Sequence, residues 1–265
     1  MLSITPHGLQ MQHVRPMVYL DHWAFRRFST NPVLSARLVQ ALRARAGTLA
    51  LSWLNLGEYA KVSVVGTREA AEQFVDAMLP AIFCIQVDPA IVNNRETAGN
   101  PWPHADEDLA VTLLNASGSL SAKGMFVKLH DAGLVATHGK LAGIVQGRLE
   151  LLRATYQTDP TFRREVEQST RPDAVAGTTR TRAITRTLAA TFFPDGRRKI
   201  KLNDAIDFLH AAIPTTYCDT VLLDGATWDL VDRARRKLKE AGVPLATAFP
   251  GRGDGVERFL NYLET

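Results

Sequence analysis

Residues 202–224, LNDAIDFLHAAIPTTYCDTVLLD, decide the fold, because they join an amphipathic helix to a short buried strand. Apolar residues recur at helical spacing from Leu202 to Ile213, which predicts a helix with one apolar face. The run TVLL at 220–223 is typical of a buried strand, and it ends at Asp224. A helix that leads into such a strand favours an α/β protein, in which helices cover a parallel sheet.

The rest of the chain repeats this alternation of short apolar runs and longer helical patterns. Further strands are predicted at residues 17–20, 48–52, 82–87 and 244–249. Helices are predicted at residues 23–28, 32–46, 54–62, 67–79, 227–241 and 255–263. We therefore expect a three-layer α/β/α fold with a central, mainly parallel sheet. Residues 104–195 show helical periodicity without a convincing strand, and residues 125–157 contain several glycines that divide them into more than one helix. They predict a helical insertion within a single domain that spans residues 1–265.

Composition excludes several classes of protein. The 265 residues are 46% hydrophobic and carry a formal net charge of +4, which is compatible with a nucleic-acid partner but does not demand one. Two cysteines are too few for a disulfide-stapled scaffold or a thiolate zinc site. No apolar stretch reaches 18 residues, and the first 20 residues lack the pattern of a secretory signal. We expect a soluble, reduced, cytoplasmic protein without membrane contact.

Three acidic residues follow predicted strands. Asp21 ends the first strand, Asp224 ends the strand at 220–223, and Glu58 lies just beyond the second strand. In open parallel sheets, ligands bind beyond the carboxyl ends of the strands, so these side chains are candidates for one site. The alternative is that each acid caps or stabilises the start of the following helix.

The helix at 202–213 supplies a fourth candidate acid. At about 100° per residue, Asp204 lies almost opposite the apolar stripe and points to solvent, whereas Asp207 lies on its flank and can border a cleft. We therefore prefer Asp207 as the functional acid. His210 follows Asp207 by one turn, where it is placed to form a hydrogen bond with it. The alternative is that both acids only complement the helix dipole.

Three segments together resemble the PIN-like domain of metal-dependent nucleases. They are VYLD at 18–21, SWLNLGEY at 52–59 and DAIDFLHAAIPTTYCDTVLLD at 204–224. The resemblance covers about residues 17–88 and 202–250. The acids that match the family pattern are Asp21, Glu58, Asp207 and Asp224. The chain departs from many relatives at Leu222, where they carry Thr or Ser, and in its much longer insertion.

The resemblance implies a nuclease that hydrolyses phosphodiester bonds with Mg²⁺ or Mn²⁺. The four acids would be the catalytic residues and the metal ligands, since hard divalent ions prefer carboxylate oxygens. Two such ions can activate water and stabilise the leaving oxygen. RNA is favoured over DNA because many members of the family act on RNA. Two alternatives stay open: a PIN-like module that binds nucleic acid or protein without catalysis, and a small-molecule phosphohydrolase.

Basic residues give candidate contacts with the substrate backbone. Arg197, Arg198, Lys199 and Lys201 lead directly into the helix that carries Asp207, and they would bind a polyanion in a salt-dependent way. The basic cluster at 233–239 is more typical of a solvated helix face. Trp23 is a candidate for stacking on an unpaired base, although a core role is at least as common. The expected partner is nucleic acid, and homo-oligomerisation stays open.

Overall fold

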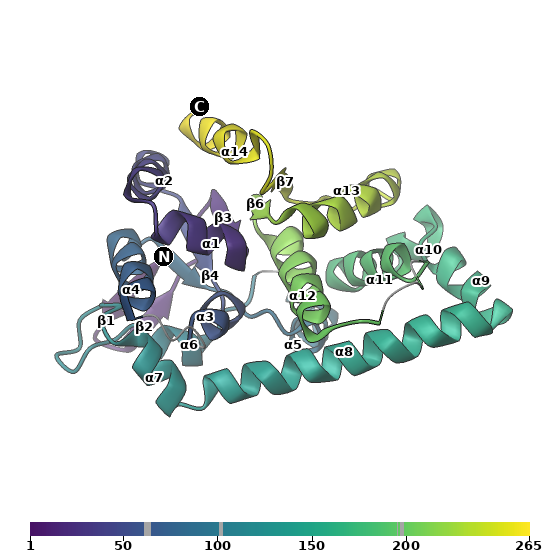
Figure 1. The fold of residues 1–265 in the computed structure, drawn as a ribbon, viewed down its shortest axis with the longest axis horizontal. Helices are drawn as coiled ribbons and strands as arrows, with labels where there is room; N and C mark the ends of the chain where they lie inside the picture. Colours follow the sequence, from purple (N-terminus) through teal and green to yellow (C-terminus); the bar gives the residue numbers. More distant parts are fainter. Residues whose placement is uncertain (61–64, 101–102, 195, 197–198) are drawn as a thin grey trace.

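A five-stranded parallel sheet forms the centre of the protein, with its strands in the order β5-β4-β3-β6-β7 (Figure 1). The structure, a computed structural model, describes residues 1–60, 65–100, 103–194, 196 and 199–265. The strands are β3 (Met17–Leu20), β4 (Thr48–Leu51), β5 (Ile82–Cys84), β6 (Thr220–Leu223) and β7 (Thr247–Pro250). All four neighbouring pairs are parallel. The α/β class and the parallel sheet are confirmed.

Three strands differ from their predicted bounds; β4 does so only by ending at Leu51 instead of Ser52. β5 ends at Cys84, opposite the last residue of β4; the next residue, Ile85, still donates to the carbonyl of Leu51 and also forms an antiparallel bridge with Ala105. β7 begins at Thr247, where the neighbouring strand begins, since Thr220 and Thr247 are partners in the register. Pairing with neighbouring residues sets the end of β5 and the start of β7. The sequence pattern does not reveal this pairing.

The apolar runs are continuous because β3, β4, β5 and β6 are buried on both faces. Val18 and Leu20 of β3 face one core, while Met17 and Tyr19 face a second core on the opposite side. Successive side chains of a strand point to opposite faces, so one four-residue run contributes to two cores.

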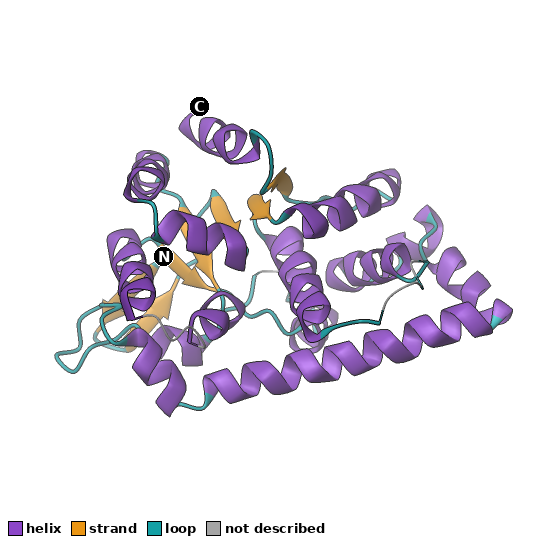
Figure 2. Cartoon of the chain, viewed as in Figure 1, coloured by secondary structure: helices purple, strands orange, loops and turns teal. Residues whose placement is uncertain are grey.

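Helices cover both faces of the sheet (Figure 2). The first core receives side chains from α1 (His22–Ser29), α2 (Pro32–Ala44), α4 (Val65–Met78) and α14 (Gly255–Glu264). The second core receives side chains from α5 (Pro89–Thr97), α12 (Leu202–Tyr217) and α13 (Gly225–Glu240). α3 (Trp53–Ala60) contributes to both. This is the arrangement of a three-layer α/β/α protein.

The helical pattern predicted for 104–195 is present, and its helices are divided between the two cores. They are α6 (Glu107–Val111), α7 (Met125–Asp131), α8 (Leu134–Thr158), α9 (Pro160–Ser169), α10 (Pro172–Ala176) and α11 (Arg180–Phe192). Residues 125–157 form more than one helix, as predicted, because the chain turns at Gly133 with a positive φ of 69°. α6 and α7 pack into the first core, whereas α8 and α11 pack into the second. α8 runs as one long helix past α3 and α12 (Figure 1). The assignment of a single domain with an insertion stays a prediction.

Two further features were not predicted. The N-terminal residues form an antiparallel hairpin, β1 (Leu2–Thr5) and β2 (Gly8–Met11), which is separate from the main sheet. α12 also continues through Pro214 to Tyr217. No helix among the described residues has both the length and the apolar character needed to cross a membrane.

Candidate active site

The topology creates a crevice between the carboxyl ends of β3 and β6. These strands are neighbours, yet the chain leaves β3 into α1 on one face and leaves β6 into α13 on the other. Connections that diverge to opposite faces open a crevice at the sheet edge, where α/β proteins bind their ligands. Asp21 and Asp224 are the residues that directly follow these two strands.

Asp21 is buried at this point and holds the two strand ends together. Its side chain is only 3% exposed. One carboxylate oxygen accepts a hydrogen bond from the backbone N–H of Ala24 at 2.8 Å, which caps α1, and the other accepts from the backbone N–H of Asp224. The Asp21 backbone N–H in turn donates to the carbonyl of Leu222 at 3.0 Å. Asp21 therefore caps a helix, as the alternative interpretation required, and also adjoins the second acid.

Asp224 caps α13 in the same way and is partly exposed. Its Oδ1 accepts from the backbone N–H groups of Ala226 at 2.8 Å and Thr227 at 3.3 Å, while its Oδ2 accepts from the Thr227 hydroxyl. Both carboxylates are thus fixed by donors from their own helix N-termini, and their orientation does not depend on a ligand.

The negative charges of three aspartates act on one another here. Burial, together with the charges of Asp224 and Asp207, raises the pKa of Asp21 to about 8, against the two backbone hydrogen bonds that lower it. Asp207 of α12 is therefore close enough to Asp21 to act on its ionisation. Nearby like charges destabilise the ionised form of a carboxyl group, whereas a bound cation would stabilise it.

The raised pKa of Asp21 predicts a decline of stability with pH. The folded chain releases this proton near pH 8 and the unfolded chain near pH 3.8, so the folded state binds more protons between these values. The free energy of unfolding should then fall as pH rises, by about 1.4 kcal/mol per pH unit between about pH 5 and pH 7. Asp21→Asn should remove this part of the slope. Urea titrations of both proteins at several pH values measure it, and parallel profiles would contradict the assignment.

Asp207 lies in a pocket of ≈ 130 Å³ that also contains Asp204. The pocket also reaches Thr227 of α13, whose hydroxyl donates to the Asp224 carboxylate. The prediction that Asp204 points to solvent was wrong: it is only partly exposed, and its carboxylate accepts from the backbone N–H of Lys201 at 2.7 Å. This hydrogen bond draws the Asp204 carboxylate back toward the start of α12.

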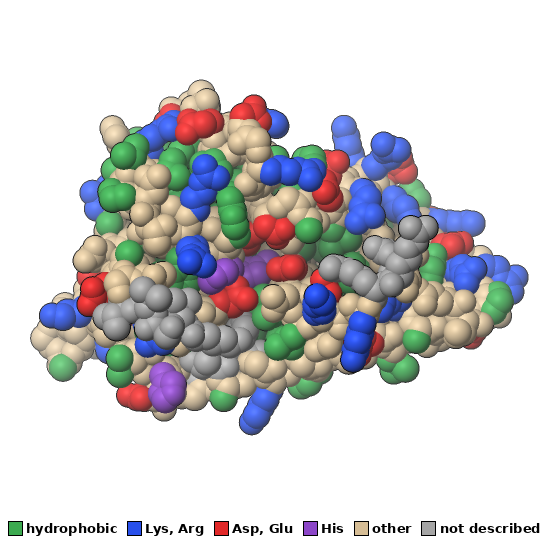
Figure 3. Space-filling model, viewed as in Figure 1, with side chains coloured by type: hydrophobic (Ala, Val, Ile, Leu, Met, Phe, Trp, Pro, Cys, Tyr) green, Lys and Arg blue, Asp and Glu red, His purple; other side chains and the backbone are tan. Residues whose placement is uncertain are grey.

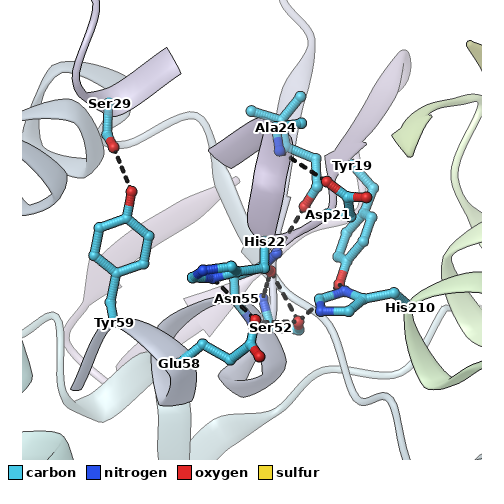
Figure 4. Close-up of polar contacts among 11 residues, drawn as sticks. Tyr19, Asp21, His22, Ala24, Ser29, Ser52, Asn55, Glu58, Tyr59 and His210 are labelled. Carbon is cyan, nitrogen blue, oxygen red and sulfur yellow. Dashed lines mark hydrogen bonds and ion pairs between the residues drawn. The ribbon is translucent and has the colours of Figure 1, made fainter. Parts of the chain in front are cut away.

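Glu58 is linked to the residues of the site by a contact with His22. Its Oε2 lies 3.1 Å from Nδ1 of His22, the residue after Asp21, and both side chains are about one quarter exposed. Figure 4 shows this pair to one side of the Asp21 carboxylate. On the surface, acidic and histidine side chains gather near the middle of the face shown in Figure 3.

A buried polar network below the carboxylates was not predicted. The hydroxyl of Tyr19 lies 3.1 Å from Ser52 Oγ and 2.5 Å from His210 Nδ1. Asn55 accepts from the backbone and hydroxyl groups of Ser52 and donates to the carbonyl of Leu20 at 2.6 Å (Figure 4). The prediction for His210 missed this Tyr19 contact, because helical spacing reveals neighbours only within the helix. The signal in the sequence was the polar Tyr19, Ser52 and Asn55 at the ends of two apolar strands.

Two of the four basic residues predicted to bind the substrate are described by the structure. Arg197 and Arg198 lie outside the described residues, while Lys199 and Lys201 are exposed before α12. Two other arginines, Arg153 of α8 and Arg233 of α13, line the pocket that contains Asp207. Arg233 is exposed, as predicted for a solvated helix face, and it also lines this pocket.

The acidic side chains of this site are of the type that binds a hard cation. Asp21, Asp207 and Asp224 offer carboxylate oxygens, which Mg²⁺ and Mn²⁺ prefer. Among the residues that the structure describes, however, no group of three or more His, Cys, Asp and Glu side chains is placed to hold a metal ion. The assignment of four metal ligands stays a prediction.

Comparisons with protein-family models, with curated proteins and with solved structures find no match for this chain. The resemblance to PIN-like domains therefore rests on the three quoted segments. The position of Asp21 and Asp224 in the sheet is an independent observation about the same residues.

Proposed function

We propose that this chain is a PIN-like, divalent-metal-dependent nuclease, with RNA favoured as its substrate. One observation carries the proposal: Asp21 and Asp224 adjoin each other where two central strands send the chain to opposite faces. The charge of Asp207 acts on the same carboxyl group. A structural cap needs only one acid for each helix, whereas three interacting acids at this position suit a cation and a phosphate.

In this proposal Asp21, Asp207 and Asp224 would hold Mg²⁺ or Mn²⁺, with Glu58 held beside them by His22. When bound, the cation supplies stabilisation of charge on the phosphate and a water of lowered pKa. The protein contributes preorganisation, because Ala24, Thr227 and the Asp224 backbone already fix the two central carboxylates. Such fixed groups need little rearrangement during the reaction.

Cationic side chains near the acids would hold the substrate backbone. Arg153 and Arg233 line the pocket of Asp207, and Lys199 and Lys201 precede the same helix. Contacts of this kind release counterions from a nucleic acid, so binding should weaken as salt increases.

A second candidate function is a PIN-like module that binds nucleic acid or a protein partner without catalysis. The absence of a ready three-ligand group among the described residues favours it. In that case Asp21 and Asp224 act only as helix caps.

The deciding experiment incubates the full chain with end-labelled single-stranded RNA or DNA, with Mn²⁺ or with EDTA. The nuclease proposal expects Mn²⁺-dependent cleavage, stronger for RNA, together with Mn²⁺ binding by calorimetry. Intact strands and no Mn²⁺ binding at millimolar concentration would favour the binding module. A chromogenic phosphodiester serves as a third substrate, since its cleavage with intact oligonucleotides would indicate a small-molecule phosphohydrolase.

A further inference from the structure

The pocket beside Asp207 has walls from four helices. α12 and α13 supply the side next to the carboxylates, while Arg153 of α8 and Phe192 of α11 line it as well. Its volume of ≈ 130 Å³ is about ten times the space that one water requires. It therefore accommodates a small ring system rather than a single solvent molecule.

The lining combines three kinds of chemistry. Phe192 and Leu230 provide apolar surface, Arg153 and Arg233 provide positive charge, and Asp204 and Asp207 provide carboxylate acceptors. Aromatic and aliphatic surface suits the face of a base, and base stacking on aromatic side chains is tolerant of sequence. Guanidinium groups suit phosphate oxygens, to which they donate in pairs. A nucleotide presents both a flat ring and a phosphate, so it matches the apolar and the cationic parts of this lining.

We propose that this pocket is a subsite for one nucleotide of the strand, next to the phosphate that is cleaved. Its base lies against Phe192 and Leu230, and its phosphate contacts Arg153 and Arg233. This inference rests on the proposed function for its location, because Asp207 lines the pocket together with Thr227, whose hydroxyl donates to Asp224.

The subsite gives the helical segment a role. Arg153 and Phe192 both lie in residues 104–195, outside the segments that resemble PIN-like domains. α8 and α11 are anchored in the same core as α12 and α13, so the two parts of the pocket are held together by buried packing. The segment would therefore shape substrate binding beside the carboxylates.

The test is a calorimetric titration of the full chain with adenosine monophosphate, adenosine or inorganic phosphate, in EDTA. We expect the monophosphate to bind more tightly than either half of it. Arg233→Ala should weaken its binding about tenfold or more, since a hydrogen bond to a charged group is lost. Lys239→Ala is the matched control, because Lys239 is an exposed basic residue of the same helix that does not line the pocket. It should leave binding unchanged.

Competition with a six-nucleotide RNA separates a strand subsite from a site for free nucleotide. The proposal expects this RNA to displace the monophosphate and expects Arg233→Ala to raise the KM for RNA cleavage. No binding of the monophosphate, equal binding of inorganic phosphate, or no displacement by RNA would each overturn it. If RNA is cleaved but Arg233→Ala changes neither binding nor KM, the subsite fails and the nuclease proposal stands. If the monophosphate binds as expected and no RNA is cleaved, the nuclease proposal fails instead.

Discussion

Asp224→Asn should reduce Mn²⁺-dependent RNA cleavage at least a thousandfold while leaving the fold intact. A thousandfold loss corresponds to about 4 kcal/mol of activation free energy, the scale expected when charge stabilisation by a metal is removed. The fold should survive because asparagine caps helices about as well as aspartate, and its Oδ1 can still accept from Ala226 and Thr227. The substitution therefore separates the two roles of Asp224: it keeps the cap and removes the charge. Single-turnover cleavage and thermal melting measure the two effects.

Asp159→Asn is the matched control. Asp159 caps α9 through the backbone N–H groups of Thr161 at 2.8 Å and Phe162 at 3.2 Å, nearly the geometry of Asp224, but it does not follow a strand of the sheet. This variant should cleave RNA at the wild-type rate. If Asp224→Asn does so as well, the carboxylate is only a cap and the nuclease mechanism is wrong.

Gly255→Ala should lower the free energy of unfolding by about 3 kcal/mol or more. A Cβ at this position would lie 1.9 Å from the carbonyl oxygen of Pro250, and a backbone atom cannot move aside as a flexible side chain can. The first turn of α14 would have to shift, which would displace Phe259 and Leu260 from the first core. Overpacking of a close contact typically costs 1–3 kcal/mol, and loss of core contacts adds to it.

Gly143→Ala gives the opposite expectation. Gly143 lies within α8 with no atom within 4 Å of its added Cβ, so alanine should stabilise the helix by about 0.5–1 kcal/mol. Urea unfolding of both variants measures the difference. Equal stability of the two variants would contradict the close approach of α14 to β7.

The sheet was predictable because β3, β4, β5 and β6 are buried on both faces. Runs such as MVYL at 17–20 and TVLL at 220–223 are uniformly apolar, and this pattern needs no knowledge of their neighbours. The N-terminal hairpin was not predictable in this way, because three of the four residues of β1 are at least partly exposed and its apolar pattern is weak. The end of β5 lies opposite the last residue of β4, and this pairing is not local in sequence.

The positions of the site residues were predictable only where a residue directly follows a strand. Asp21 and Asp224 adjoin because parallel strands place their carboxyl ends at one edge of the sheet. The pairing of Glu58 with His22, and the presence of Arg233 in the pocket, depend on how side chains from separate helices meet. Helical periodicity gives the direction of a side chain relative to its own helix and not to its neighbours. For the same reason, the sequence did not reveal that the helices of residues 104–195 pack into two different cores.

The pairing of β3 with β6 affects how the chain folds while it is being synthesised. The hydrogen bond that links their ends joins residues 203 positions apart, so a nascent chain exposes β3 as an unpaired edge until β6 emerges from the ribosome. Until then only the β3 side of the crevice is present. Under the nuclease proposal, a chain assembled in this order would stay inert beside the message and the ribosome that are still producing it.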